Sequence, residues 1–404
     1  MSHPAPQSAP RRAKEAAASL FRDPSFRAAF AAFAVTRLLI LALVLASAQL
    51  TIVHPDPDSD YGNGSINFRG TRVTRILRAR ASRGDGNWYM SISQFGYDRR
   101  PYSAERQANW AFFPVYPLLL RAAARLTGDM PLTGVLLSTL LLLPALFLLH
   151  RTALAFGLDA KAADRTVFYV AAFPVSYFFS LPLTESLFLL LTVGSFYAAK
   201  RERWLVAGLL GALASATRVT GVLLFPALAL VYWETYRTLR PRLNFLPLLL
   251  VPAGLLSFMF FLYRTTGNAF AFRDITVEAW GRRPQFFLTT LLSYLTNPLV
   301  VAEPWDFRLL NFLAASAALA CGLVLLKRRA WSLACYALAS TLVALSNSLL
   351  HSQARYAMVV FPAFMVVAAA ARTPRIDQVI RTVFLILLTL MTLLYSMHVD
   401  TAMA

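Results

Sequence analysis

The amino-acid sequence predicts an all-α protein that crosses a lipid bilayer many times. Of its 404 residues, 57% are hydrophobic and 15% are charged, whereas a soluble domain would contain about a quarter charged residues. The mean hydropathy is +0.54. Apolar runs of on the order of 20 residues, long enough to cross a bilayer as helices, recur between residues 28 and 397. Helices satisfy their own backbone groups in lipid, and no β-barrel pattern is present.

The apolar segments follow one another along the chain, separated by short polar connections. We expect membrane spans at residues 28–50, 131–150, 167–181, 184–200, 245–263, 308–326, 331–350, 356–371 and 377–397. The stretch 204–236 predicts two short helices with a break near Thr217 and Arg218. There is no internal sequence repeat of the kind that marks many transporters.

Basic residues between the apolar segments predict the orientation of the helices. The clusters are the N-terminal tail, Arg151/Lys161/Arg165, Lys200/Arg201/Arg203, Arg237/Arg240/Arg242, Lys327/Arg328/Arg329 and Arg372/Arg375. Cytoplasmic loops are enriched in Lys and Arg, and placing every cluster there gives about eleven crossings. We therefore expect a cytoplasmic tail at residues 1–27, followed by one transmembrane domain at 28–404. The tail is too long and too polar to be a cleaved signal peptide.

The same orientation places two long loops outside the cytoplasm, at residues 51–130 and 264–307. It requires residues 112–127 not to cross, and the prolines and arginines of that segment suit a helix lying in the membrane interface. The net charge of +19 comes from clusters that would meet anionic lipid headgroups. Membrane lipids are therefore the expected partners of this charge, and nucleic acid is not. Both cysteines, Cys321 and Cys335, lie in apolar spans, so no disulfide framework is implied.

The most informative polar segment is residues 83–89 (RGDGNWY), in the first of these loops. Asp85 is a carboxylate that can take a proton from an attacking alcohol. Glycines on both sides of it let the backbone approach a ligand closely, and Trp88 and Tyr89 offer flat faces suited to a sugar. A loop aspartate in a glycine turn, beside an interfacial belt of aromatic side chains, accounts for the same residues equally well.

An acidic cluster, Asp56, Asp58 and Asp60, directly follows the first apolar span. Carboxylate oxygens of this kind can bind a hard divalent cation such as Mg or Mn. The cluster does not match a calcium loop, because Tyr61 stands where glycine is needed and Asn67 where glutamate is needed. A solvated loop stiffened by proline is favoured over a metal site.

Three further charged residues lie at outward-facing turns between apolar segments. Glu185 follows Thr184 at the start of a span, which is typical of a helix cap, but a carboxylate entering apolar surroundings usually has a partner or a task. Arg218 lies in the break between two helices, and Arg355 lies near His351. An arginine fork suits a lipid phosphate, while snorkelling to the interface explains each arginine alone.

Seven short motifs in this order resemble the PIG-V-like mannosyltransferases, which are the second mannosyltransferase of GPI-anchor assembly and its bacterial relatives. They are Asp-Gly-x-Trp-Tyr (85–89), Gly-Tyr (96–97), Phe-Phe-Pro-x-Tyr-Pro-Leu (112–118), Phe-Pro-x-Ser (173–176), Thr-Glu-Ser (184–186), Thr-Arg-x-Thr-Gly (217–221) and Arg-Tyr before Phe-Pro (355–362). The matches are colinear over about residues 85–362. The family usually has Trp before the Asp, where this chain has Gly84.

The resemblance implies a fold of the GT-C glycosyltransferase superfamily, a bundle of about eleven transmembrane helices. It implies transfer of a sugar, mannose, from a polyprenyl-phosphate-linked donor to a hydroxyl of a glycan, lipid or protein, with inversion. The site would face the extracytoplasmic side of a bacterial inner (plasma) membrane. Carried over by position, the roles are general base for Asp85, second site carboxylate for Glu185, donor-phosphate binding for Arg218, Arg355 and neighbouring His351, and acceptor or sugar binding for Asn87, Trp88, Tyr89 and Tyr116.

Two other classes of function share part of this pattern. A lipid-linked-sugar flippase or transporter would have the same spans and headgroup-binding arginines, but it would need polar residues near the bilayer midplane. A non-catalytic partner in an envelope assembly would use the aromatic loop for docking. The sequence contains no phosphate-cradling glycine loop, zinc-type Cys/His spacing or nucleophile elbow, so a soluble nucleotide donor is not supported.

Overall fold

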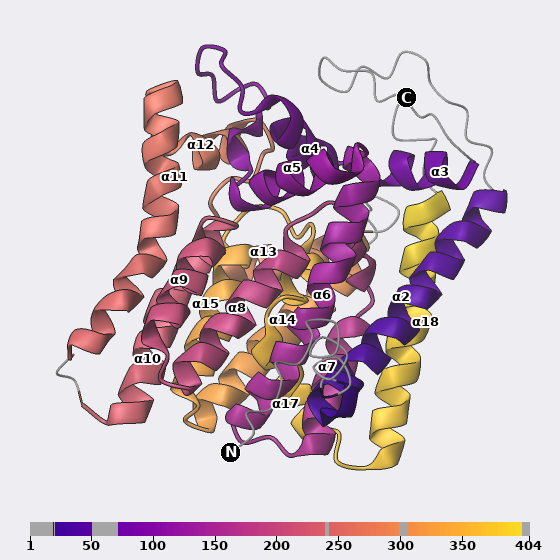
Figure 1. Ribbon diagram of the computed structural model, residues 1–404, viewed down its shortest axis with the longest axis vertical. Coiled ribbons are helices and arrows are strands. Elements are labelled where there is room, and N and C mark those ends of the chain that lie inside the picture. The colour runs from indigo at the N-terminus through magenta and orange to yellow at the C-terminus, as the bar shows by residue number, and fades with distance from the viewer. Residues whose placement is uncertain (1–18, 20, 51–71, 239–241, 299–305, 398–404) are drawn as a thin grey trace, which may run out of the picture.

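The computed structural model describes residues 19, 21–50, 72–238, 242–298 and 306–397 (Figure 1). Across these ranges the chain folds into helices, and its one β-type pairing is an isolated bridge between Pro284 and Asn347. The predicted all-α class is therefore confirmed. The predicted acidic cluster at residues 56–60 lies outside the described residues.

Most of the helices run side by side as a bundle (Figure 1). The bundle helices are α2 (Pro24–Leu50), α6 (Met130–Ala155), α7 (Ala160–Ala171), α8 (Glu185–Lys200), α9 (Trp204–Ser215), α10 (Leu224–Tyr236), α11 (Leu250–Thr266), α14 (Arg308–Lys327), α15 (Trp331–Leu345), α17 (Phe361–Ala370) and α18 (Pro374–Met397). Shorter elements are α13 (Phe287–Thr296), α16 (Gln353–Ala357) and the 3-10 helices η1 (Asn109–Ala111), η2 (Ser176–Ser180), η3 (Val219–Leu223) and η4 (Leu243–Leu249).

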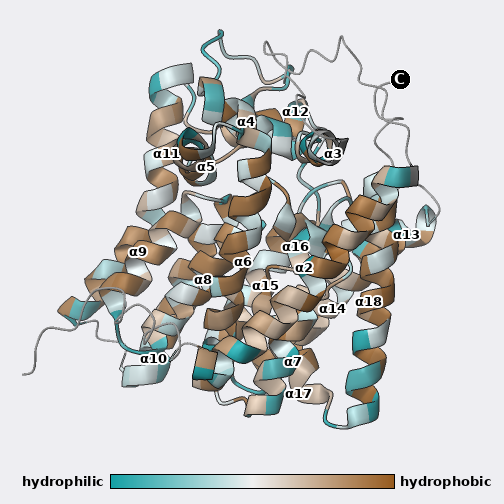
Figure 2. Ribbon diagram, turned by 45° about the vertical axis from the view of Figure 1, so that its right-hand side comes forward, coloured by the Kyte–Doolittle hydropathy of each residue, from teal (hydrophilic) through white to brown (hydrophobic). Residues whose placement is uncertain are grey.

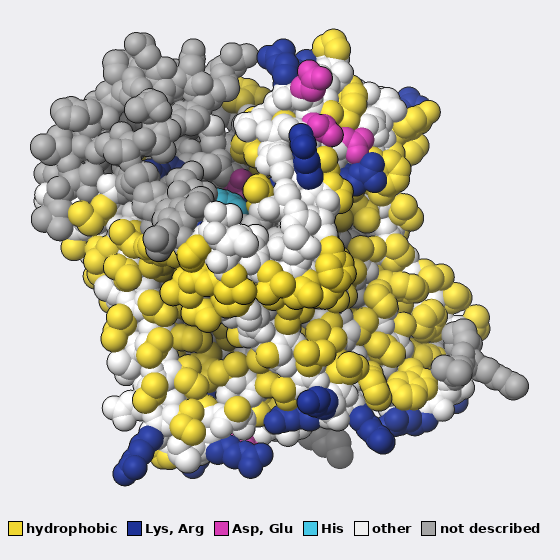
Figure 3. All heavy atoms as spheres, turned by 180° about the vertical axis from the view of Figure 1, so that it is seen from behind, with side chains coloured by type: hydrophobic (Ala, Val, Ile, Leu, Met, Phe, Trp, Pro, Cys, Tyr) yellow, Lys and Arg dark blue, Asp and Glu magenta, His cyan; other side chains and the backbone are white. Residues whose placement is uncertain are grey.

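Length and hydropathy identify the helices that can cross a bilayer. In the described part of the chain, six helical segments are long and apolar enough: Pro24–Gln49, Met130–Ala155, Val219–Tyr236, Leu243–Thr266, Arg308–Lys327 and Pro374–Met397. Apolar residues dominate the bundle helices, and polar residues gather at their ends (Figure 2). On the face seen in Figure 3, hydrophobic atoms cover the middle, with Lys and Arg along the lower edge. The number of eleven crossings stays a prediction, because several apolar helices are shorter than these six.

The predicted span at 167–181 is wrong in detail, because it is not one continuous helix. Helix α7 ends at Ala171, and η2 begins after Pro174. Proline lacks the N–H that a helix needs and clashes with the carbonyl four residues earlier. Arg37 of α2, which is buried, donates hydrogen bonds to the carbonyls of Ala171 (2.9 Å) and Ser176 (2.8 Å). An arginine on a neighbouring helix therefore satisfies carbonyls near this break.

Four helices form a layer across one end of the bundle (Figure 1). They are α3 (Arg72–Ala81), α4 (Asp85–Phe95), α5 (Val115–Thr127) and α12 (Ala271–Glu278). The interfacial segment predicted at 112–127 thus contains a helix of 13 residues, which agrees with its prediction as a non-crossing element. It exposes Leu118 and Leu126 together with Arg121 and Arg125, a combination suited to a lipid–water boundary.

A buried arginine attaches this layer to the bundle. Arg80 of α3 donates to the carbonyls of Val44 (2.9 Å) and Ser396 (2.9 Å) and to Ser47 Oγ (2.8 Å). Ser396 lies in the last turn of α18, where helix carbonyls have no partner within their own helix and where a positive charge is favoured. Val44 and Ser47 lie near the end of α2. Because Asp85 begins the next helix, Arg80 also helps to place Asp85 over the bundle.

Candidate active site

A cavity of about 610 Å³ lies where the end layer meets the bundle. Its walls come from α4, α8, the end of α15 and the segments 111–113, 217–220, 270–284 and 355–360. Most of the lining is apolar, but one part carries Asp85, Arg218, Arg282 and Arg355. Segments from distant parts of the sequence therefore converge on one charged region.

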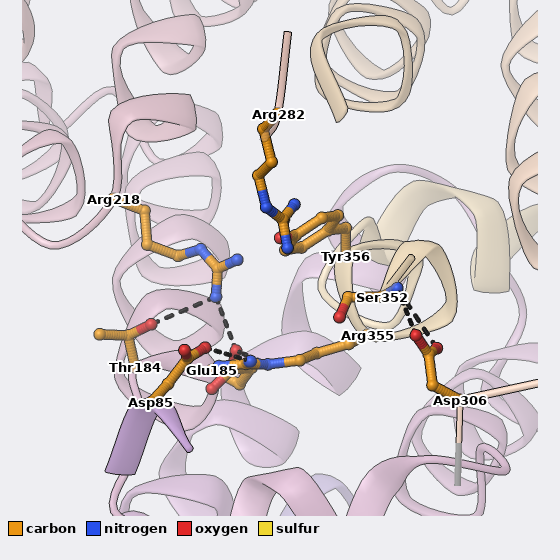
Figure 4. Close-up of polar contacts among 9 residues, drawn as sticks. All are labelled: Asp85, Thr184, Glu185, Arg218, Arg282, Asp306, Ser352, Arg355 and Tyr356. Carbon is orange, nitrogen blue, oxygen red and sulfur yellow. Dashed lines mark hydrogen bonds and ion pairs between the residues drawn. The ribbon is translucent and has the colours of Figure 1, made fainter. Parts of the chain in front are cut away.

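Two carboxylates and two guanidinium groups are linked in a chain in this region (Figure 4). Arg355 Nη1 lies 2.5 Å from Asp85 Oδ2, and Arg355 Nε lies 2.7 Å from Glu185 Oε1. Arg218 Nη1 lies 2.7 Å from the same oxygen of Glu185. Glu185 thus bridges both arginines, and Arg355 bridges both carboxylates.

Glu185 is fully buried, so its charge depends on these arginines. Its side chain has 0% exposure, and its Oε2 atom has no hydrogen-bond partner among the described residues. Thr184 precedes the helix but makes no capping hydrogen bond with its side chain. Its hydroxyl instead accepts a hydrogen bond from Arg218 Nη1 at 3.2 Å. The side chains of Thr184 and Glu185 therefore accept hydrogen bonds from Arg218 instead of capping the helix.

Two glycines allow Asp85 to start its helix at this position. Gly84 has φ +51°, a conformation that favours glycine, so a residue with a side chain would be strained at this position. A Cβ atom on Gly86 would lie 2.5 Å from the carbonyl oxygen of Ala81. Arg83 Nη1 donates to the carbonyl of Tyr395 at 2.9 Å. The turn before α4 is therefore tight and attached to α18.

Arg218 lies in the predicted break between two helices. Helix α9 ends at Ser215, Arg218 has an extended backbone (φ −151°, ψ 144°), and η3 begins at the next residue. Its guanidinium lies 5.7 Å from the ring centre of Phe188 and 5.5 Å from that of Tyr356. Aromatic faces on the cation, together with Glu185, hold Arg218 beside the cavity.

The short helix α16, which carries Arg355, is held in place by Asp306. The carboxylate of Asp306 accepts hydrogen bonds from the Ser352 amide (3.2 Å) and from Asn311 Nδ2 (2.6 Å), and it pairs with His351 Nδ1. Burial would raise the pKa of Asp306, but the His351, Asn311 and Ser352 donors hold it below its usual value. Asp306 is therefore an ionised anchor for the start of α16.

The protonation of the α4 side chains follows from their neighbours. Burial would raise the pKa of Asp85, but the positive charge of Arg355 and its hydrogen bond, with Arg282 and Arg218 beyond, lower it below the ordinary value. Asp85 is thus ionised at neutral pH while 44% of its side chain remains exposed. Burial raises the pKa of Tyr89 well above its usual range, so its phenol stays protonated.

The structure brings together four of the site residues predicted from the sequence: Asp85, Glu185, Arg218 and Arg355. Tyr89 also lines the cavity. The roles of these residues stay predictions. Among the described residues there is no group of three or more His, Cys, Asp or Glu side chains that could hold a metal ion.

Four other predicted residues do not line the cavity: His351, Asn87, Trp88 and Tyr116. His351 pairs with Asp306 instead. Trp88 stacks on Phe112, with ring centres 5.7 Å apart. Tyr116 is fully buried, and its hydroxyl lies 2.8 Å from Ser138 Oγ. Trp88 and Tyr116 thus pack against residues beside the cavity rather than facing it.

Two residues of this region are not among the site residues predicted from the sequence. Arg282 lines the cavity and donates from Nη1 to the Tyr356 hydroxyl at 2.8 Å. Asp306 anchors α16, as described above. Both lie in the predicted loop 264–307, one beside Arg283 and the other after Trp305. A cation or an acid in a long polar loop is ordinary, so neither position carried a signal that the sequence alone could reveal.

Comparison with known proteins gives matches to solved structures only. No protein-family model matches the chain, and no curated protein does. The oligosaccharyltransferase of Archaeoglobus fulgidus, tethered with an acceptor peptide, matches at 14% identity with a TM-score of 0.40, over 90% of this chain and 54% of that one. ArnT from Cupriavidus metallidurans, bound to undecaprenyl phosphate, matches at 17% identity with a TM-score of 0.45, over 85% of this chain and 60% of that one. The chain thus spans little more than half the length of these proteins, and such identities do not establish a shared substrate.

Proposed function

We propose that the protein is a membrane glycosyltransferase that moves a sugar from a polyprenyl-phosphate-linked donor to an acceptor hydroxyl. One observation carries the proposal: an ionised, partly exposed carboxylate, Asp85, shares a largely apolar cavity with the guanidinium groups of Arg218, Arg282 and Arg355. An acid that can take a proton and cations that can stabilise a phosphate are the two groups that such a transfer requires.

In the proposed reaction Asp85 is the general base. Its carboxylate takes the proton of the acceptor hydroxyl while the hydroxyl oxygen forms a bond to the anomeric carbon. The bond between that carbon and the phosphate oxygen breaks on the opposite face, so the configuration inverts. The lipid phosphate leaves with the electron pair and needs no strong general acid. A low pKa makes Asp85 a weak base, and its proton transfer is therefore expected late, when the hydroxyl has become acidic.

The arginines are proposed to stabilise the phosphate as negative charge develops on it. Arg218 uses only Nη1 in the hydrogen bonds found among the described residues, with Thr184 and Glu185. Its other nitrogens remain for a ligand. Arg355 donates from Nε to Glu185 and from Nη1 to Asp85. Its proposed role is therefore to orient Asp85 and keep it ionised.

Finer assignments come from the sequence resemblance and are part of the proposal. They are a GT-C fold of the PIG-V-like type, mannose as the sugar, a glycan, lipid or protein as acceptor, and a site on the extracytoplasmic face of a bacterial plasma membrane. A Mg or Mn ion at Asp56, Asp58 and Asp60 also remains open to test. Activity after EDTA treatment, with and without added Mg or Mn, would decide it.

The proposal is tested by incubating the purified protein in lipid nanodiscs with radiolabelled polyprenyl-phosphate-mannose and an extract of membrane acceptors. We expect label to appear in an acceptor while polyprenyl phosphate is released in equal amount. In sealed vesicles, movement of intact labelled lipid between leaflets without sugar release would instead identify a flippase. If neither sugar transfer nor lipid movement is observed, both activities are contradicted and a scaffold is favoured.

A further inference from the structure

We propose that Arg282, together with Arg218, recognises the phosphate group of the ligand. The inference deepens the proposed function and rests on it for the identity of the ligand as a polyprenyl phosphate. It starts from the distribution of charge in Figure 4. Four arginines line the cavity, and three of them, Arg218, Arg273 and Arg355, are already paired with carboxylates.

Arg282 is the arginine without an acidic partner. Among the described residues no carboxylate lies within ion-pair distance of it, and its guanidinium makes one hydrogen bond, from Nη1 to the Tyr356 hydroxyl at 2.8 Å. Its guanidinium lies 5.8 Å from the centre of the same ring. A cation–π contact offsets only part of a cation's loss of water. The side chain therefore brings a positive charge that an anionic ligand can neutralise.

The backbone around Arg282 holds this charge in place. Its loop pairs with the segment after α15: the Ser348 amide donates to the carbonyl of Arg283 at 2.8 Å, and Ser348 Oγ donates to the carbonyl of Gly281 at 3.0 Å. Gly281 has φ +64°, which permits the turn before Arg282. A side chain on a loop tethered in this way is better ordered for binding than one on a free surface arm.

The position of Arg282 also fits the reaction that we propose. Its charge is among those that lower the pKa of Asp85, so the two groups act on the same part of the cavity. In Figure 4 Arg282 and Arg218 enter from above Asp85, on different elements. A phosphate held between these two guanidinium groups would leave its sugar directed toward Asp85. The planar fork of arginine suits such a group.

The lining beside Arg282 favours a lipid phosphate over free phosphate. Phe270, Phe272 and Val277 belong to the same wall of the cavity, and apolar side chains gain nothing from a small hydrated anion. They do bury an attached hydrocarbon chain favourably. The chemistry that this wall recognises is therefore a phosphate monoester or diester on an apolar tail.

The experiment measures binding of undecaprenyl phosphate, undecaprenol and inorganic phosphate to purified protein in detergent, by native mass spectrometry. The variants are Arg282→Gln, Arg282→Lys and the matched control Arg283→Gln, an exposed arginine that does not line the cavity. We expect R282Q to lose about tenfold or more in affinity for undecaprenyl phosphate, the scale of a hydrogen bond to a charged group. Binding of undecaprenol should not change, R282K should be intermediate, and R283Q should match the wild type.

Equal affinity of R282Q and wild type for undecaprenyl phosphate would overturn the inference, as would an equal loss for undecaprenol. Binding of inorganic phosphate without the lipid would overturn the assignment of a lipid ligand. If R282Q does not fold, Tyr356→Phe provides the second variant, because it removes only the hydroxyl that orients Arg282. If R282Q loses affinity for undecaprenyl phosphate but the wild type transfers no sugar, the phosphate site is supported and the proposed enzymatic function is refuted. If the wild type transfers sugar but R282Q binds undecaprenyl phosphate as well as the wild type does, the enzymatic function is supported and the role of Arg282 is refuted.

Discussion

At the scale of single residues, Asp85 combines two properties that a general base in this cavity needs. Arg355 keeps it ionised, and nearly half of its side chain remains exposed. Glu185 does not share the second property, since it is fully buried between two arginines. The two carboxylates therefore have different roles: Asp85 can contact a substrate, and Glu185 holds the two arginines in position.

We predict that Asp85→Asn keeps the fold and lipid binding but lowers sugar transfer by ~10²-fold or more, the scale of losing a general base. Asparagine has nearly the same shape and cannot accept the proton. The measurement is the rate of radiolabelled sugar transfer, with Glu105→Gln as control, because Glu105 is an exposed acid in the segment that follows α4 and does not line the cavity. A transfer rate in D85N equal to that of the wild type would rule out Asp85 as the base.

The sequence predicts the four charged residues at the centre of the site but not Arg282, which lies beside them. Asp85, Glu185, Arg218 and Arg355 stand out because a charge at the edge of an apolar span is costly without a partner or a task. Arg282 lies in a polar loop, where a charge costs little. Its place in the site depends on how that loop pairs with the segment after α15, which no local pattern encodes.

At the scale of elements, apolar composition predicted where helices lie better than where they stop. The break at Thr217 and Arg218 was predicted and is present. The break before η2 was not predicted, although Pro174 lies within the expected span. A proline can either kink a helix or end it, and here Arg37, more than 130 residues earlier in the chain, donates to carbonyls on both sides of the break. Such a long-range partner cannot be read from the local sequence.

We predict that Arg37→Met destabilises the protein by at least ~2 kcal/mol, the scale of losing hydrogen bonds from a charged donor. Methionine fills similar space but removes the guanidinium that donates to the carbonyls of Ala171 and Ser176 inside the bundle. The measurement is the midpoint of thermal unfolding in detergent. Arg27→Gln is the control, since Arg27 is an exposed arginine of the same helix. Equal midpoints for R37M and R27Q would show that the break does not need Arg37.

The anchor of α16 gives a prediction that depends on pH. Because the pKa of Asp306 is lowered on folding, its ionisation stabilises the fold at pH values above its ordinary pKa of 3.8. That stabilisation is lost as the pH falls through the lower folded value. Asp306→Asn should therefore unfold at a lower temperature than the wild type at neutral pH, and the difference should shrink below about pH 4. Thermal unfolding measured from pH 3 to 8 tests this, and a difference independent of pH would contradict it.

At the scale of the whole molecule, the site and the basic clusters lie at opposite ends of the bundle. Helix α8 starts with Glu185 at the site and ends with Lys200 after 16 residues, a rise of about 24 Å. Helix α14 starts just after Asp306 and ends with Lys327 after 20 residues, a rise of about 30 Å. Charge pattern and fold agree in this respect, which is why composition alone could predict a polarised membrane protein. The number of crossings is harder to predict, because short and interrupted helices pack inside the bundle.

This polarity yields a prediction about orientation in the membrane. If the basic ends face the cytoplasm, as Lys and Arg enrichment indicates, a cysteine at Glu105 is reached from outside the cell and a cysteine at Lys327 is not. Both positions are exposed, and the native Cys321 and Cys335 can be replaced by alanine to give a background without thiols. In intact cells, a membrane-impermeant maleimide should label Glu105→Cys alone, and it should label Lys327→Cys after lysis. Labelling of Lys327→Cys in intact cells would invert the orientation. A donor sugar would then have to reach Asp85 from the cytoplasmic leaflet, and the extracytoplasmic reaction proposed here could not take place.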